Sequence, residues 1–68
     1  MMYVTFDEVG GAYRAKHGLL GYYKARGITH DPSRIVLSNK RLQVDGVPVS
    51  VLEKIAKNIK KDAKIIHV

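Results

Sequence analysis

Basic side chains alternate with tyrosines over a short stretch of the sequence, between residues 13 and 26. Such cations neutralise phosphates, and aromatic rings beside them stack on bases or pack on sugars. Two more arginines follow before residue 42, and the planar fork of arginine suits a phosphate group or the edge of a guanine. The pattern predicts a nucleic-acid-binding surface made of Arg14, Lys16, Tyr22, Tyr23, Lys24, Arg26, Arg34 and Arg41.

The overall charge agrees with this prediction. The 68 residues include 12 Lys and Arg against 6 Asp and Glu, a formal net charge of +6. A basic excess attracts polyanions and is typical of small nucleic-acid-binding or regulatory domains. We therefore expect a nucleic acid, DNA or RNA, as the partner.

A structural interpretation of the same residues is also open, and a second function fits the chain. Tyrosines in very small domains are often part of the core, and the surrounding cations then only keep the surface soluble. A compact chain of this size without cysteine or a catalytic motif also fits a protein-interaction module, an inhibitor or accessory subunit that docks on an acidic or apolar surface of a larger protein. This protein-partner function is the alternative to nucleic-acid binding.

Residue types for other chemistry are missing or have structural roles. The chain contains no cysteine, which excludes disulfides, thiol catalysis and thiolate zinc sites. The histidines His17, His30 and His67 lack the spacing of metal ligands. The carboxylates sit at expected helix starts, turns or solvated faces, and no serine has a histidine nearby. We expect no enzyme activity, no metal and no cofactor.

Length and hydropathy limit the class of protein further. One domain over residues 1–68 is all that this length accommodates. No apolar run approaches the 18 residues of a membrane span, and the first residues lack the pattern of a signal peptide. We expect a soluble cytoplasmic domain without membrane contact.

The first elements that position the basic residues are a short strand and a helix. Residues 2–4 are apolar and favour a strand. Thr5 and Glu8 have the spacing of a capping box, which predicts a helix that starts near Phe6.

Glycines divide this helical region. Gly18 favours the end of a first helix, and residues 19–26 then form a second short helix that Gly27 closes. A single helix over residues 6–26 is the alternative, in which Gly18 and Gly21 mark close packing rather than a break.

Two strands are predicted in the middle of the chain. Residues 31–33 have the sequence of a turn or a helix start. Residues 35–37 favour a strand, and residues 41–44 alternate apolar and polar side chains as a half-buried strand does. Asn39-Lys40 is a candidate turn between them.

The pair Asp45-Gly46 has the sequence of a hairpin turn, since both residues tolerate positive φ. The returning strand would cover residues 47–49. Pro48 has no N–H to donate, so this strand is expected at a sheet edge.

The last predicted helix, over residues 50–62, has the clearest amphipathic pattern in the chain. Ser50 and Glu53 fit a capping box at its start. Its apolar stripe predicts nearly complete burial of Ile55 and Ile59.

Residues 65–68 read as a final strand, and the whole order is β-α-α-β-β-β-α-β. We expect an α+β fold, a short antiparallel or mixed sheet with the helices packed on one face.

One fragment resembles a known family. The run from Leu20 to Ile28, followed by Pro32 and Arg34, resembles a stretch of MerR-type and related excisionase winged-helix DNA-binding domains. In those domains an arginine before the paired aromatic residues touches DNA, whereas this chain has Gly21 there. The resemblance covers about a fifth of the chain and implies DNA binding.

Overall fold

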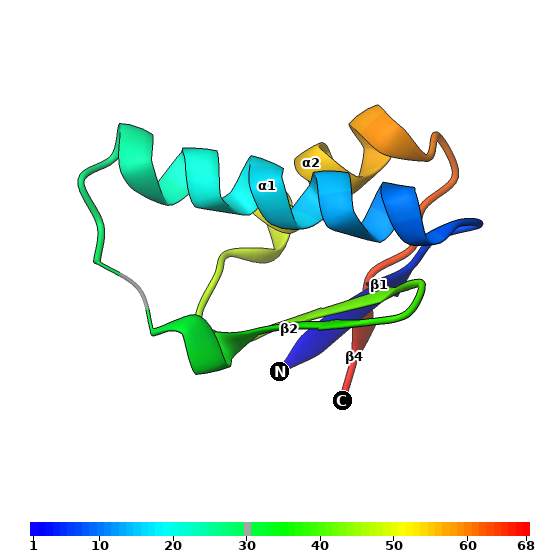
Figure 1. Cartoon of the computed structure of the whole chain (residues 1–68), viewed down its shortest axis with the longest axis horizontal. Helices are drawn as coiled ribbons and strands as arrows, with labels where there is room; N and C mark the ends of the chain where they lie inside the picture. The colour runs from blue at the N-terminus through cyan, green and yellow to red at the C-terminus, as the bar shows by residue number, and fades with distance from the viewer. Residues whose placement is uncertain (30) are drawn as a thin grey trace.

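Over the described residues, 1–29 and 31–68, the chain folds into two helices on one face of a four-stranded antiparallel sheet (Figure 1). The structure is a computed structural model, and His30, one of the three histidines considered above, lies outside the described residues. The elements, in chain order, are β1 (Met2–Thr5), α1 (Val9–Ala25), the 3-10 turn η1 (Pro32–Arg34), β2 (Ile35–Ser38), β3 (Arg41–Val44), α2 (Val49–Ile59) and β4 (Ile66–His67).

The sheet has the strand order β2-β3-β1-β4, and each neighbouring pair is antiparallel. Strands β1 and β2 are therefore parallel to each other with β3 between them, and α1 connects them. In the same way, α2 connects β3 to β4, with β1 lying between those two strands. Two interleaved split β-α-β units of this kind make up the ferredoxin-like topology.

The predicted α+β class, with helices on one face of a short sheet, is confirmed. The order of elements differs from the prediction at two places. One long helix replaces the two short helices, and residues 47–49 do not form a strand.

Strict alternation in the strands separates a buried face from an outer face. Successive strand side chains point to opposite sides of a sheet, so alternate residues meet the helices. The inward positions join apolar residues of both helices in one core, made chiefly of Met2, Val4, Ile35, Leu42 and Val44 from the strands and Ala12, Ala15, Leu19, Leu52 and Ala56 from the helices.

The capping box predicted at the start of α1 is wrong, because Thr5, the first residue of that box, belongs to the sheet. Thr5 is the last residue of β1 and pairs with Arg41. Glu8 is the N-cap residue without a side-chain hydrogen bond, and the helix begins at Val9. Between them the N–H of Phe6 donates to the carbonyl of Lys40 at 2.8 Å, which fastens this connection to the β2–β3 turn.

Helix α1 continues through Gly18, so the predicted break is wrong. The single-helix alternative is correct, although the helix covers Val9–Ala25 instead of residues 6–26. Gly18 lies against α2, where an added Cβ would come within 2.9 Å of Cγ2 of Ile55. The glycine therefore allows the two helices to pack closely. Gly27, with φ of +65°, follows the end of the helix as predicted.

The turn between β2 and β3 lies at Asn39-Lys40, as predicted, and Asn39 has a φ of +57°. The predicted hairpin at Asp45-Gly46 is wrong, although Gly46 does have a positive φ of +78°. Both edges of β3 are already paired, one with β1 and one with β2. A strand over residues 47–49 would have no place beside β3, so the chain turns away into α2.

Helix α2 ends earlier than predicted and is not capped by Ser50. Pro48 is its N-cap residue, with no side-chain cap hydrogen bond, and Glu53 instead accepts a hydrogen bond from Nζ of Lys57 at 3.1 Å. Leu52 and Ala56 are the buried residues of this helix. Ile55 and Ile59, which were predicted to be nearly fully buried, are half-buried at its margins.

Two glycines of α1 make a matched test of the helix packing. An added Cβ at Gly21 meets nothing within 4 Å among the described residues. We expect Gly21→Ala to raise the free energy of unfolding by about 0.5–1 kcal/mol, because alanine loses less backbone entropy than glycine in a helix. Gly18→Ala should lower it, since overpacking costs about 1–3 kcal/mol. Urea unfolding monitored by circular dichroism measures both.

The double variant Gly18→Ala/Ile55→Ala is the control for this pair. In the Ile55→Ala background the Cγ2 atom that an added Cβ would meet is gone. The double variant should therefore be no less stable than Ile55→Ala alone. Equal stabilisation by Gly18→Ala and Gly21→Ala would show that α2 does not lie against Gly18.

Candidate functional site

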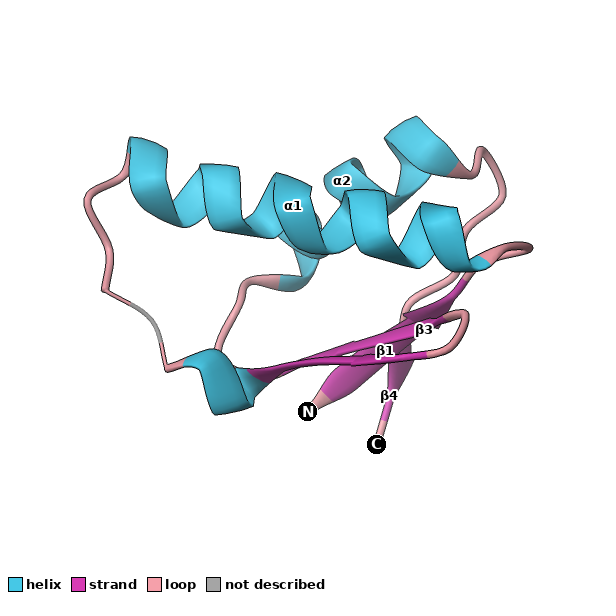
Figure 2. Ribbon diagram, in the orientation of Figure 1, coloured by secondary structure: helices cyan, strands magenta, loops and turns pink. Residues whose placement is uncertain are grey.

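The outer face of the sheet is not covered by either helix (Figure 2). Its residues follow from the strand register, because directly paired residues share a face. Tyr3 pairs with both Gln43 and Ile66, and Thr5 pairs with Arg41. The outward positions are Tyr3 and Thr5 on β1, Val36 and Ser38 on β2, Arg41 and Gln43 on β3, and Ile66 on β4. We call these residues the open face.

Arg41 lies over the ring of Tyr3 at the centre of the open face. The guanidinium carbon is 4.2 Å from the ring centroid. The two residues sit on neighbouring strands in diagonal register, which lets the long arginine side chain reach across to the ring. A guanidinium above an aromatic face is held by the ring quadrupole and by stacking.

The charge of Arg41 has no acidic partner within the part of the chain that the structure describes. The ion pairs there link Met1 with Asp45, Arg14 with Glu8, Lys57 with Glu53, and Lys60 with Asp7. Arg41 is exposed, and its side chain contacts an aromatic ring. Its charge is therefore available to a ligand.

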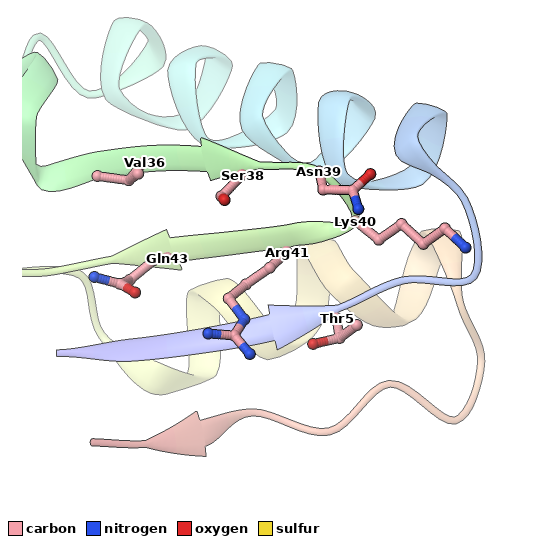
Figure 3. A pocket seen from close by; sticks show the side chains of 7 residues that line it. All are labelled: Thr5, Val36, Ser38, Asn39, Lys40, Arg41 and Gln43. Atoms are coloured by element: carbon pink, nitrogen blue, oxygen red, sulfur yellow. The ribbon is translucent and has the colours of Figure 1, made fainter.

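A shallow hollow of about 490 Å³ opens beside Arg41, at the end of the sheet where β2 turns into β3 (Figure 3). Lys40 and Arg41 bring two cations, and Figure 3 shows the Arg41 side chain extending from β3 across β1. The lining contains hydroxyls, amides and one apolar side chain but no carboxylate: Thr5, Val36, Ser38, Asn39, Lys40, Arg41 and Gln43. Such a set of donors suits an anion.

The basic residues predicted from the sequence lie on two separate sides of the molecule. Arg14, Lys16 and Lys24 belong to α1, and Arg26 is its C-cap residue, so these four are in the helix layer. Arg41 is on the open face across the sheet from them. The structure does not bring the predicted set together in one surface.

Within the helix layer, Arg14 has an acidic partner, and Arg26 lies over an aromatic ring as Arg41 does. Arg14 pairs with Glu8 at 3.7 Å. The guanidinium carbon of Arg26 lies 5.0 Å from the ring centroid of Tyr22, which makes a second arginine–tyrosine pair on α1.

The two adjacent tyrosines of α1 have different environments. Tyr23 is 7% exposed and belongs to the core, which removes it from the candidate nucleic-acid surface. Tyr22 is half-buried and meets the ring of Tyr23 edge-on at 5.7 Å. Only Tyr22 of this pair presents part of its ring to the outside.

Arg34 lies at the other end of β2 from the hollow. Its guanidinium lies beside Gly46, where an added Cβ would come within 2.7 Å of Nη1. The surrounding space of about 320 Å³ is also lined by Asp31 and Asp45, so it has mixed charge. Asp31 accepts a hydrogen bond from the N–H of Ser33 at 3.0 Å, which confirms the predicted turn.

The prediction from sequence missed Tyr3 and Lys40. Tyr3 follows the alternation of residues 2–5, whose inward members are Met2 and Val4. That alternation is visible in the sequence and places Tyr3 on the other face. Its position at the sheet centre beside Arg41 depends on the pairing of β1 with β3, which no local pattern shows.

Among the described residues, no group of three or more His, Cys, Asp or Glu is placed to hold a metal ion. Neither helix in that part of the chain is long and apolar enough to cross a membrane.

Comparison with protein-family models, with curated proteins and with solved structures finds no match in any of the three. The MerR-type resemblance belongs to residues that form the second half of α1 and the connection to β2, within a split β-α-β fold.

Tyr23 predicts a dependence of stability on pH. Burial raises the pKa of its hydroxyl above the ordinary value of 10.0, Tyr22 raises it further, and Arg34 lowers it in part. The folded state thus holds this proton more tightly than the unfolded chain, so the stabilisation is complete below pH 10 and is lost as the pH rises through the pKa of the folded state. We expect the free energy of unfolding to fall above pH 10 more steeply in the wild type than in Tyr23→Phe. Urea titrations at several pH values measure this difference. The prediction is wrong if the free energies of unfolding of the wild type and of Tyr23→Phe fall in parallel above pH 10.

Proposed function

We propose that this protein binds nucleic acid and that the open face, together with Lys40, is its binding surface. The observation that carries the proposal is the guanidinium of Arg41, which lies above Tyr3 at the edge of a hollow without carboxylates and has no acidic partner among the described residues. Phosphate groups are the anions that such a set of cations, hydroxyls and amides suits in a chain with a net charge of +6.

The distribution of acidic residues supports this choice of surface. Asp7, Glu8 and Glu53 each pair with a cation of the helix layer or its connections. Their charges are compensated locally, and none of them occupies an outward strand position. The lining of the hollow has no carboxylate, and Asp45, which follows β3 at the far end of the sheet, lies 3.7 Å from the N-terminal amine.

The hollow and the arginine have different tasks in this function. Lys40 and the hydroxyls of Thr5 and Ser38 can donate to phosphate oxygens at the turn end of the sheet. Arg41 lines the hollow and also reaches the sheet centre. A strand of nucleic acid that crosses the open face would meet both.

Arg41→Ala tests the binding surface. We expect weaker binding to every nucleic-acid sequence, because phosphate contacts carry no sequence information. The slope of log K against log salt concentration should become shallower by about 0.7 to 0.9, the loss of one phosphate contact. Fluorescence anisotropy with a labelled oligonucleotide over a series of salt concentrations measures both quantities.

Lys54→Ala is the matched control, since it removes the same charge from an exposed position on α2. It should leave the affinity and the salt slope nearly unchanged. Equal effects of the two variants would mean that the open face is not the binding surface, and Arg14→Ala would then examine the cations of α1. A wild-type protein that binds no nucleic acid at low salt would favour the protein-partner alternative.

A further inference from the structure

We infer that the nucleic acid bound on the open face is single-stranded, and that one unpaired base stacks on the Arg41–Tyr3 pair. This inference rests on the proposed function and names the class of its ligand. The proposed function uses only the positive charge of Arg41. The inference adds that the guanidinium and the Tyr3 ring beneath it stack with a base.

The Arg41–Tyr3 pair offers a base a place to stack, because the guanidinium carbon lies 4.2 Å from the ring centroid. Tyr3 is on a central strand with β3 on one side and β4 on the other, so its backbone is held by both neighbours. The guanidinium lies above the ring, and its outer side faces the solvent because Arg41 is exposed. Unpaired bases stack on arginine planes as well as on aromatic rings, either above the guanidinium or in its place on the ring.

The shape of the open face favours a single strand. Four strands at a spacing of about 4.8 Å give a sheet about 14 Å wide, and strands of four residues are of similar length. Within the described residues both helices lie on the other side of the sheet, so neither can enter a groove from this side. In a duplex the bases are already stacked on each other, and only an unpaired base can reach a ring at the sheet centre.

The sheet also places a phosphate site next to the stacking surface. The Arg41 side chain that covers Tyr3 lines the hollow with Lys40 and Ser38. Lys40 lines the same hollow, so a phosphate of the bound strand that enters the hollow would meet this second cation. Both parts of a nucleotide find complementary chemistry on one small surface.

Arg41→Lys separates stacking from charge, because lysine keeps the positive charge and loses the plane. We measure binding of a short single-stranded oligonucleotide and of the corresponding duplex. The wild type should bind the single strand more tightly. Arg41→Lys should weaken that binding by about 5- to 150-fold, the range of one lost base stack, and leave the salt slope unchanged. Tyr3→Leu, which keeps an apolar side chain on the strand, should have a similar effect.

The chain offers a matched control in its second arginine–tyrosine pair. Arg26, the C-cap residue of α1, lies over Tyr22 in the helix layer, on the other side of the sheet from the open face. Arg26→Lys makes the same chemical change there and should leave single-strand binding unaltered. Circular dichroism of each variant confirms that the fold is intact.

A direct optical readout is available because the chain contains no tryptophan. Tyr3→Trp places a unique fluorophore at the stacking position. Its emission should be quenched by the single strand and not by heparin, a polyanion without bases.

The outcomes distinguish this inference from the proposed function. Equal affinity for single strand and duplex, with no loss in Arg41→Lys, would overturn the stacking inference and leave phosphate binding in place. The absence of binding to either nucleic acid by the wild type would overturn both.

Discussion

The pairing of β1 with β3 at the centre of the sheet is the constraint on which the rest of the structure depends. It occupies one edge of β3, and the local β2–β3 hairpin occupies the other. The chain after β3 therefore leaves the sheet, crosses it as α2 and returns beside β1 as β4. The same pairing places Arg41 diagonally across from Tyr3 and so creates the centre of the open face.

The composition of the chain explains why one side of this sheet is left bare. The two helices bury the inward apolar side chains of β1, β2 and β3, and no helix among the described residues lies on the other side of the sheet. The outward positions hold mainly polar or amphipathic residues, with half-exposed Val36 and Ile66 as the apolar members. A surface of this kind tolerates water and still offers a flat area for a ligand.

Local patterns predicted the elements better than the way they fit together. The alternation of residues 41–44 and the turn at Asn39 depend on neighbours in sequence, and both are confirmed. The capping box of Thr5 and the hairpin at Gly46 are equally good local patterns. Both are wrong because of strand pairing with residues distant in sequence. Thr5 pairs with Arg41 in the sheet, and both edges of β3 are paired, so no strand can follow Gly46 beside it. The same limit applies to the candidate site. The sequence prediction grouped the cations of α1 with Arg41, whereas the fold separates them and places Arg41 over Tyr3, near the start of the sequence.

The central place of β1 also affects the order in which the fold can assemble. The hairpin of β2 and β3 joins residues close in sequence, but β1 must find β3 across α1 and β4 across nearly the whole chain. Closing such long loops costs chain entropy before any contact compensates for it, so the non-local pairings form slowly. During synthesis β1 leaves the ribosome before both of its neighbours, and its two edges remain unpaired until they follow. The central strand β1 is thus the first strand to be synthesised, and it forms its pairings with β3 and β4 only after both have been made.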